Sequence, residues 1–581
     1  MYQYKIDKIS FNDGTSISPG ALTIIVGPNN CGKSRILKDI KSLTSDHNKH
    51  SVVVTDVEYA IPDTVESLKS AYKITTYKDQ NNNVSLRTLS ANLVTQHNVG
   101  VGVDWEQNCQ NWLDQKNDNT KNQFSHWFGS FFVSLFGTED RLKLIKESES
   151  SEKGITNNLL QAFYYEGSEV ENKLRVIVKE AFDRDIRLDF STLRKILFRI
   201  GKDLEDVPID LRDAISYYEQ FEKLDEQGDG LRSFVATLLV ILVGKRSVLL
   251  LDEPESFLHP PQAFRLGEVI AEHAVDERQL VVATHSSDFL KGVLSKRQDI
   301  TILRVDRHDK VNKINMLESK DVAVISRDPL LSSTRIMDGL FYKGAIIVEA
   351  DADAVFYQRI SRQLNDADNF HIAHAHNKQT VAKVLPPYRL LGIPFAAIVD
   401  FDVIRVRDEF RSLLKQFEIP SEKITEALEY QSSLVEYIEN VDPKEMLNNL
   451  ITEMKNEIDR ITANEKNLDE PSLIKVLAGN LKRIRESGNT WKQYKKEGVG
   501  ALSKDAQNYF YSLDSICSEY GLFIVPVGEL ESLLVEHGLP FSSKKSKWIV
   551  KALKLIPSLQ PNMEVLPWCF VQRVFKFLNK N

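Results

Sequence analysis

The sequence predicts two consecutive α/β domains, each built on a mostly parallel sheet, and three observations lead to this fold class. Short apolar runs typical of buried strands alternate with amphipathic helical patterns in both halves of the chain. Several of these runs end in acidic residues or in a glycine-containing loop. Two long polar stretches with helical periodicity, about residues 105–225 and 405–500, interrupt the alternation. We expect each stretch to be a helical insertion into one of the domains.

The predicted strands divide into two series, with a boundary expected within residues 325–342. We therefore predict one domain over residues 1–335 and a second over 336–581, with a helix beginning at Lys33 in the first. The strands expected in the first domain are 21–26, 51–56, 247–251, 279–283 and 300–305. Those expected in the second are 345–348, 369–373, 394–399 and 521–526.

Composition limits the class of protein. Of 581 residues, 42% are hydrophobic and 27% are charged, which is ordinary for a soluble protein. No apolar run reaches the ~20 residues that cross a bilayer, and the first residues do not resemble a signal peptide. Four scattered cysteines without metal-ligand spacing predict a reduced, cytoplasmic protein. A net charge of −8 argues against a surface coated by nucleic acid, but it leaves room for a local basic groove.

The stretch GPNNCGKS, residues 27–34, fits the pattern G-x-x-x-x-G-K-[ST] between a predicted strand and a predicted helix. Glycines at the two fixed positions let backbone N–H groups turn toward phosphates. The lysine reaches the terminal phosphates, and the serine hydroxyl binds Mg²⁺. The helix N-terminus adds a favourable potential for the anion. The predicted ATP-binding residues here are Gly27, Asn29, Asn30, Gly32, Lys33 and Ser34.

Two later motifs complete a nucleotide site. The run SVLLLDEP ends in Asp252, which we expect in the Mg²⁺ shell, and Glu253, which would polarise the attacking water. One βα unit later, QLVVATHS places His285 at a strand end, where it could sense the γ-phosphate. An isolated strand with two acids, or an isolated histidine, would more often be structural. Together with the phosphate loop, they predict an ATPase.

These motifs resemble those of the ABC-type ATPases, with residues 258–260 in the place of the D-loop. The resemblance implies a signature loop, and EQGDGLRSF is the candidate, with Gly230 and Ser233 facing a γ-phosphate. It also implies a homodimer or higher homo-oligomer, because the signature of one head completes the site of another. The glutamine of the Q-loop could be Gln80 or Gln96.

Three strand ends of the second domain carry acids. In a parallel sheet these ends meet at one edge, and carboxylates are the ligands that Mg²⁺ and Mn²⁺ prefer. Two such ions can support phosphodiester cleavage. Asp351 is the exception, since an acid in a first helical turn is favoured by the helix dipole alone. The acids at the strand ends are Glu349 and Asp353, Asp400 and Asp402, and Glu529 and Glu531.

The pattern V-E-x-x-x-D followed by D-x-D resembles a Toprim domain, although Ala350 stands where that family usually has glycine. The resemblance implies a lysine near the C-terminus that stabilises the transition state. Lys547 is preferred over Lys544 and Lys545, and Lys378 could touch phosphate. It also implies the metal ligands Glu349, Asp353, Asp400 and Asp402, with Glu531 preferred over Glu529 as a further one.

An ABC-type ATPase followed by a Toprim domain resembles the OLD (overcoming lysogenization defect) family. That resemblance implies an ATP-regulated, Mg²⁺- or Mn²⁺-dependent endonuclease acting on DNA, in defence against phage. The stretches QGDGLRSF and IIVEADAD suggest its retron-associated branch, with a reverse transcriptase and noncoding RNA as partners. The alternatives are a non-nucleolytic ATPase that binds or senses DNA, a primase- or topoisomerase-like enzyme, and an RNA substrate.

Overall fold

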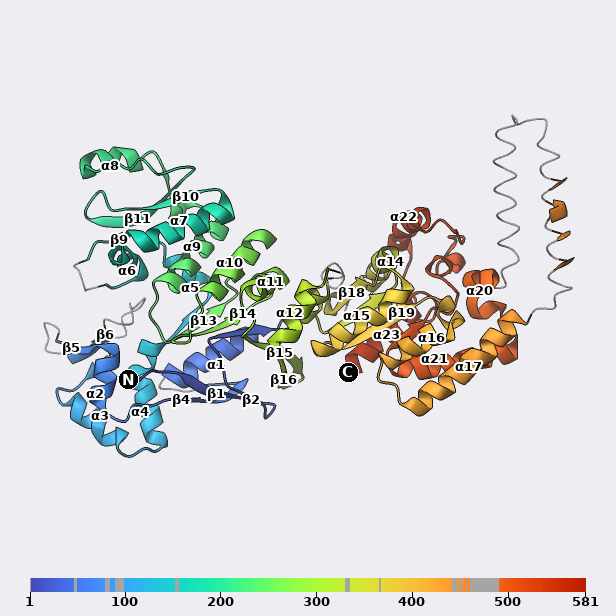
Figure 1. The fold of residues 1–581 in the computed structure, drawn as a ribbon, viewed down its shortest axis with the longest axis horizontal. Coiled ribbons are helices and arrows are strands. Elements are labelled where there is room, and N and C mark those ends of the chain that lie inside the picture. Colours follow the sequence, from blue (N-terminus) through green and yellow to red (C-terminus); the bar gives the residue numbers. More distant parts are fainter. Residues whose placement is uncertain are drawn as a thin grey trace. The chain divides into compact units, whose positions relative to one another are not determined.

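The computed structural model describes residues 2–45, 50–78, 84–88, 99–151, 156–329, 335–364, 367–440, 447–448, 451–452, 454–456, 458–459 and 491–580. The chain divides into two compact units, Met1–Pro329 and Leu330–Asn581. Helices and strands alternate in both (Figure 1). Within the described ranges, no helix is long and apolar enough to cross a membrane.

The first unit is built on a six-stranded sheet in the order β16-β15-β3-β14-β13-β8. Neighbouring strands run parallel except for β16, which pairs antiparallel with β15. Every residue of β3 and β14 is buried, as expected for parallel strands covered on both faces. The strands are β3 (Leu22–Val26), β8 (Val133–Phe136), β13 (Val248–Asp252), β14 (Gln279–Ala283), β15 (Thr301–His308) and β16 (Val311–Leu317).

Helices and smaller sheets surround this sheet. The helix predicted from Lys33 is present as α1 (Lys33–Ser45), directly after the phosphate loop. An antiparallel sheet of β2 (Ser16–Ile17), β1 (Ile6–Phe11) and β4 (Val54–Tyr59) lies in the same unit. A second one joins β5 (Ile74–Lys78), β6 (Val84–Thr88) and β7 (Val99–Val101). Other helices of this unit are α2 (Val65–Tyr72), α9 (Asp229–Leu242), α10 (Pro260–Glu272), α11 (Ser287–Lys296) and α12 (Ser319–Arg327).

The stretch 105–225 is only partly the helical insertion that the sequence predicts. Its helices are α3 (Trp105–Leu113), α4 (Asp118–Phe132), α5 (Thr138–Lys143), α6 (Leu159–Glu166), α7 (Ser168–Phe182) and α8 (Leu211–Tyr218). However, β8 from this stretch is an edge strand of the central sheet. The helical prediction is also wrong for β10 (Asp185–Asp189) and β11 (Lys195–Gly201), which pair antiparallel. The shorter β9 (Ser148–Glu149) and β12 (Glu222–Lys223) both pair with β11.

A local backbone feature explains this correction. Asp183 adopts a left-handed conformation (φ 53°), which ends α7. The residues after it are rich in isoleucine, leucine and phenylalanine, which suit a half-buried pleated surface. Across the hairpin, the Arg199 guanidinium donates to the Asp189 carboxylate at 2.9 Å. The helical spacing of apolar residues in the sequence therefore continues beyond Asp183, where the helix itself ends.

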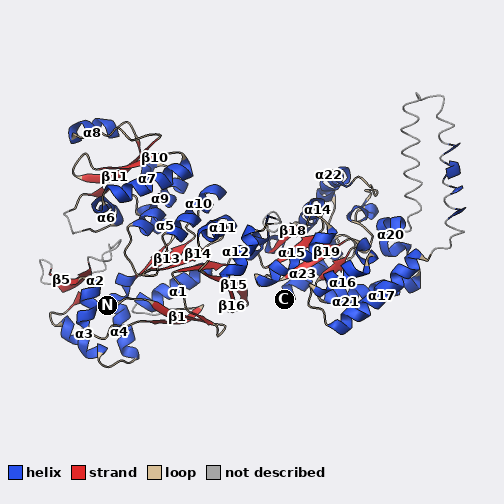
Figure 2. Cartoon of the chain, viewed as in Figure 1, coloured by secondary structure: helices blue, strands red, loops and turns tan. Residues whose placement is uncertain are grey.

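The second unit contains a four-stranded parallel sheet in the order β18-β17-β19-β20. All four strands were predicted, at positions that differ by a few residues. They are β17 (Gly344–Val348), β18 (Phe370–His374), β19 (Phe395–Val399) and β20 (Leu522–Ile524). Figure 2 shows helices around this sheet. They include α15 (Lys378–Leu390) and also α14 (Asp351–Ser361), α22 (Lys545–Leu555) and α23 (Trp568–Lys580), and the buried faces of these last three share one core with the strands.

The described part of the stretch 405–500 is helical, as expected. It contributes α16 (Arg407–Lys415), α17 (Ser421–Glu439) and α20 (Trp491–Glu497). Helix α17 packs against α21 (Lys504–Glu519), which leads back into the sheet at β20. The insertion therefore leaves the sheet after β19 and returns beside it, and α20 brings charged residues close to the ends of the strands.

Candidate functional site

The loop between β3 and α1 has the backbone expected of a phosphate loop. A Cβ on Gly27 would lie 2.2 Å from the Val305 carbonyl oxygen, so no larger residue fits there. The Lys33 Nζ donates to the carbonyl oxygens of Gly27 at 2.7 Å and Pro28 at 2.8 Å. The lysine side chain is therefore folded back over its own loop. Positive φ angles occur at Gly27 (148°), Asn30 (62°) and Gly32 (109°).

Ser34 and Asp252 are brought together from positions far apart in the sequence. The Ser34 hydroxyl donates to the Asp252 carboxylate at 2.9 Å. Asp252 ends β13, next to β14, which in turn neighbours β3. Burial, and to a lesser extent the nearby Glu253, raise the pKa of Asp252 despite that hydrogen bond. A hydroxyl and a carboxylate side by side are oxygen ligands of the kind that Mg²⁺ takes.

Glu253 and His285 also meet, with 2.6 Å between the carboxylate and Nε2 of the ring. The hydrogen bond from His285 lowers the pKa of Glu253, with burial acting in the opposite direction. An ionised glutamate held by a strand-end histidine can orient and deprotonate a water molecule. The structure thus brings together two residues that the sequence analysis assigned to separate roles at the nucleotide.

Two residues that the motifs did not reveal hold this acid pair in place. Arg141, from α5, is fully buried and donates to the carbonyl oxygens of Asp252 and Glu253, each at 2.7 Å. The buried Glu255 accepts from the Thr284 hydroxyl at 2.6 Å and from the His285 N–H at 2.9 Å. Glu255 lies within the motif itself. Arg141 lies 111 residues before Asp252, and no local signal marks it.

The predicted signature loop is only partly supported. Ser233 is fully buried in α9, so the expectation that it faces a γ-phosphate is corrected. It lies more than a full turn into the helix, on the side that packs into the core. Gly230, in the first turn, packs closely on the loop after β13, since a Cβ there would lie 2.7 Å from the Phe257 carbonyl oxygen. The two Q-loop candidates, Gln80 and Gln96, lie outside the described residues.

The acids of the second unit gather at the carboxyl edge of its sheet. β17, β19 and β20 are adjacent, and acids follow all three. The Glu349 carboxylate accepts from the Asp400 N–H at 2.9 Å, which joins two of these strand ends directly. The Asp353 carboxylate accepts from the Ala350 N–H at 2.9 Å. Three members of the group are buried, namely Asp353, Asp402 and Glu531, whereas Asp351 is exposed.

Crowding of these carboxylates shifts their pKa values. Burial first, and then the charges of Asp402 and Asp353, raise the pKa of Glu349 to about 7. Burial and the charge of Glu349 raise the pKa of Asp400 well above its ordinary value. Burial also raises the pKa of Glu531. Carboxylates that raise one another's pKa in this way are short of positive charge.

Lysines from three separate segments supply part of that charge. Lys545, at the start of α22, lies 2.7 Å from Asp353. Lys495, on α20, lies 2.8 Å from Asp402 and 3.2 Å from Glu529. Lys378, at the start of α15, lies 3.2 Å from Asp402. Burial would raise the pKa of Asp402, but its contacts with Lys495 and Lys378 lower it.

The structure favours Lys545 over Lys547 as the lysine that faces the acids. Lys547 is exposed, and no contact of its side chain with an acid occurs among the described residues. Two residues apart on a helix means about 200° of rotation, so the two lysines point to opposite sides of α22. Burial would lower the pKa of Lys545, but the nearby Asp353 and Asp400 raise it. Lys495 was visible in the sequence only as part of a basic cluster.

The donor set fits a divalent cation. In the described part of the chain, no three His, Cys, Asp or Glu side chains are already grouped closely as metal ligands. Two lysines, Lys545 and Lys495, lie against three of the acids, namely Asp353, Asp402 and Glu529. The three acids that remain, Glu349, Asp400 and Glu531, all have raised pKa values. An oxygen-only, electron-rich set of this kind is what Mg²⁺ or Mn²⁺ selects.

Comparison with known proteins finds a matching domain in each of the two units. Residues 22–291 match the AAA_21 family, an AAA domain described with the AbiEii toxin of a type IV TA system. Residues 340–402 match the TOPRIM domain of proteins like the overcoming lysogenization defect protein. The OLD nuclease of Thermus scotoductus (strain ATCC 700910 / SA-01) is 25% identical over 193 residues, which cover 31% of this chain and 36% of that protein. The match thus spans about a third of that relative's length.

Solved structures similar to this chain include heads of SMC proteins. An SMC head bound to the C-terminal winged-helix domain of ScpA is 14% identical, with a TM-score of 0.34, and covers 54% of this chain and 98% of its own. The SMC head domain from Thermotoga maritima is 14% identical, with a TM-score of 0.29, and covers 54% and 99%. The domain matches are the informative ones. This chain joins an N-terminal AAA-type ATPase domain to a C-terminal, OLD-like TOPRIM domain, which confirms the predicted combination.

Proposed function

We propose that this protein is an ATP-regulated, divalent-metal-dependent endonuclease that cleaves DNA. The observation that carries the proposal is the convergence of acids from three adjacent strand ends in a TOPRIM-type domain. The ATPase domain supports regulation by nucleotide, since its phosphate loop, acid pair and histidine lie together. Mg²⁺ is the expected ion in both sites, with Mn²⁺ an alternative at the TOPRIM acids.

The residues of the second unit would divide the work of cleavage. Glu349, Asp353, Asp400, Asp402 and Glu531 are the proposed metal ligands. Divalent ions at such a site activate water and stabilise the leaving oxygen. Lys545 lies beside Asp353, where its ammonium group can stabilise negative charge that develops on the phosphate. Lys378, at the start of α15, can hold the phosphate backbone of the substrate.

The test is the variant Asp400→Ala, assayed on linear and supercoiled plasmid with Mg²⁺ or Mn²⁺. We expect loss of cleavage, because this residue lies among the proposed ligands, while ATP binding at the other unit is retained. Asp351→Ala is the matched control, since Asp351 is an exposed acid close by in sequence. It should cleave within about twofold of the unmodified protein. Cleavage by Asp400→Ala at the normal rate would refute the assignment.

A second candidate is an ATPase that binds or senses DNA without cutting it. The contacts of Lys495 and Lys545 with three of the acids favour it, because paired carboxylates can be purely structural. The same plasmid assay separates the two functions. DNA binding without nicking, with either ion and with ATP, ADP or neither, would support the second candidate over the first.

We further propose that the ATPase units work as a homodimer or higher homo-oligomer in defence against phage. Gly230, at the start of α9, packs on the loop after Asp252, where a partner's nucleotide would be met. The test is the oligomeric state of Glu253→Gln, by light scattering with and without ATP. A mass that stays that of one chain under both conditions would contradict the dimer.

A reverse transcriptase with its noncoding RNA remains the expected partner, and co-purification of the two proteins tests it.

A further inference from the structure

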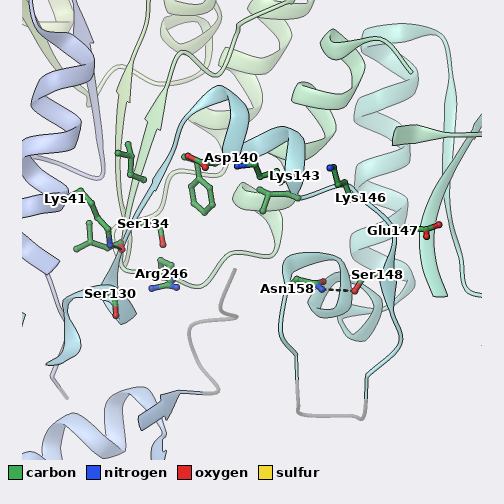
Figure 3. Close-up of a pocket in the computed structure, with 14 residues that line it drawn as sticks. Lys41, Ser130, Ser134, Asp140, Lys143, Lys146, Glu147, Ser148, Asn158 and Arg246 are labelled. Atoms are coloured by element: carbon green, nitrogen blue, oxygen red, sulfur yellow. Dashed lines mark hydrogen bonds between the residues drawn. The ribbon is translucent and has the colours of Figure 1, made fainter. Parts of the chain in front are cut away.

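The first unit has a cavity that none of the preceding roles uses. Its volume is about 510 Å³, within the ~300–1,000 Å³ typical of small-ligand sites. Figure 3 shows basic and hydroxyl side chains from several elements around it. Those that matter below are Lys41, Ser130, Ser134, Lys143, Lys146 and Arg246. Its lining follows the edge strand β8 along its whole length into α5, and Arg246 stands two residues before β13.

Arg246 is the unusual member of this group. The residue is 4% exposed, and its Nε and Nη1 atoms are buried without a hydrogen-bond partner among the described residues. No ion pair with a described carboxylate is formed either. Burial alone lowers the pKa of Arg246 to about 10, so the side chain is still a cation at neutral pH. A buried charge without a partner is costly, and proteins normally compensate for it.

The other buried arginines of the same unit show that compensation. Arg141 donates to three backbone carbonyl oxygens and stabilises the acid pair. Arg304 lies 3.1 Å from the Asp306 carboxylate. These two guanidinium groups each contact oxygens of the chain, whereas no hydrogen bond or ion pair of the Arg246 guanidinium with a described residue occurs. This difference points to a ligand as the partner of Arg246.

The charge around the cavity has the sign that such a partner requires. Lys143 and Lys146 are exposed at its rim, and Lys41 donates to the Val133 carbonyl oxygen at 2.8 Å. Of the two acids at the rim, Glu147 already lies 2.7 Å from Lys195, outside the cavity lining. The serine hydroxyls add neutral donors. A guanidinium, lysines and hydroxyl groups together are the donors that recognise phosphate oxygens.

We propose that this cavity binds a small phosphate-bearing anion, with the Arg246 guanidinium as its buried anchor. The site is separate from the phosphate loop, because no residue of 27–34 lines it. It is connected to the ATPase centre through α5. Lys143 at the end of α5 lines the cavity, and Arg141 on the same helix holds the carbonyl oxygens of Asp252 and Glu253. Occupancy of the cavity therefore changes the rate of ATP hydrolysis.

Calorimetry with inorganic pyrophosphate, and separately with orthophosphate, tests binding. The background is Lys33→Ala, which weakens phosphate binding at the phosphate loop. We expect one site in Lys33→Ala and at least tenfold weaker affinity in Lys33→Ala/Arg246→Met. Lys143→Ala in the same background should weaken it by a smaller factor. Equal affinity with and without Arg246, or no binding of either anion at millimolar concentration, would overturn the proposal.

Thermal melts distinguish a binding role from a structural one. If Arg246 serves a ligand, Arg246→Met leaves the melting temperature without ligand unchanged or higher, because methionine removes a buried charge without leaving a large cavity. In the Lys33→Ala background, the rise in melting temperature that pyrophosphate causes should disappear when Arg246→Met is added. A variant that melts several degrees lower, with the pyrophosphate effect intact, would show a structural role and refute the proposal.

The link to catalysis is read from ATP hydrolysis at increasing pyrophosphate. Competition at the phosphate loop is common to the unmodified protein and Arg246→Met, so a difference between their curves isolates the cavity. We expect a change of at least twofold that only the unmodified protein shows. Coincident curves would refute the coupling between the cavity and ATP hydrolysis.

A short DNA oligonucleotide serves as the alternative ligand. If it binds through Arg246 while pyrophosphate and orthophosphate do not, the ligand of the cavity is nucleic acid and the proposal of a small anion is refuted.

Discussion

The two acidic sites of this protein solve the same electrostatic problem in different ways. In the ATPase domain each acid has its own partner, since Asp252 meets Ser34 and Glu253 meets His285. In the TOPRIM domain the Glu349 carboxylate accepts only from the Asp400 backbone N–H among the contacts described, and lysines from three segments lie against the neighbouring Asp353 and Asp402. In the first site each carboxylate is held by a contact with one neighbouring side chain. The second site holds carboxylates whose pKa values are raised by burial and by the charges of neighbouring acids.

The difference teaches where each site gets its order. The ATPase acids follow short motifs at the ends of adjacent strands, and Arg141 fixes their backbone. The TOPRIM acids depend on side chains that the insertion and the C-terminal helices bring in. We therefore expect substitutions in the first site to act directly on ATP hydrolysis, and on cleavage only through the proposed regulation by nucleotide. Substitutions in the second should alter cleavage, metal dependence and the pH dependence of stability together.

The largest expected effect is that of Glu253→Gln on ATP hydrolysis. Removing a general base lowers such rates by roughly 10²–10⁴-fold, while ATP binding should persist because Lys33 and Ser34 are unchanged. Phosphate release measures the rate, and a fluorescent ATP analogue measures binding. Ser256→Ala, which loses only a 3.4 Å contact with Glu253, is the control and should stay within about twofold. Hydrolysis at a normal rate in Glu253→Gln would contradict the role of Glu253 as the general base.

The next effect is the pH dependence of stability without metal. The pKa of Glu349 rises from its ordinary 4.5 to about 7 on folding. The folded state therefore holds this proton more tightly than the unfolded state. The free energy of unfolding should fall as pH rises from about 4.5 to about 7, by at most about 3 kcal/mol. Asp402, whose pKa is lowered, acts with the opposite sign at more acidic pH and does not cancel this trend.

Urea unfolding in EDTA between pH 5 and pH 8 measures this effect. Mg²⁺ added at pH 8 should recover the lost stability, because the ion binds the folded carboxylates. Glu349→Gln, which keeps the shape but cannot ionise, should flatten the curve. Stability that is constant or rises across this range in EDTA would contradict the crowding of acids in the TOPRIM domain.

Lys545 and Lys547 give a matched pair of substitutions. Lys545→Ala should reduce DNA cleavage by about 10²-fold, the size reported for losing one donor that stabilises developing negative charge. Lys547→Ala should change cleavage by less than about twofold, since its side chain is exposed on the opposite side of α22. Initial rates on supercoiled plasmid measure both. The reverse order of effects would restore the sequence-based preference for Lys547.

The smallest expected effect is that of Lys495→Met. Loss of this lysine removes its ion pairs with Asp402 and Glu529, worth roughly tenfold in cleavage rate if they position the acids. The pKa of Asp402 should also rise, which a shift of the acidic limb of the pH–rate profile would report. Lys496→Met, one residue away, lies 3.6 Å from Glu497 rather than from the acid group and serves as the control. An equal effect of both variants would mean that α20 acts through its fold alone.

The sequence by itself predicted the two sheets, the alternation of strands and helices in them and the acids that follow their strands. This succeeded because a phosphate loop, a strand that ends in two acids and an acid-x-acid pair are local patterns. A parallel sheet then places the carboxyl ends of neighbouring strands at one edge whatever the intervening chain does. Glu349 and Asp400 meet for this reason, although 51 residues separate them.

The tertiary structure decided what local patterns do not encode. Helical periodicity did not show that residues 185–201 form a hairpin, because one left-handed residue ends the helix before them. It did not show that Ser233 faces the core, or which of three clustered lysines reaches the acids. The roles of Arg141, Lys495 and Arg246 were missed for one reason. The role of a charged side chain depends on which groups surround it in space. Those groups come from segments that the sequence places far away.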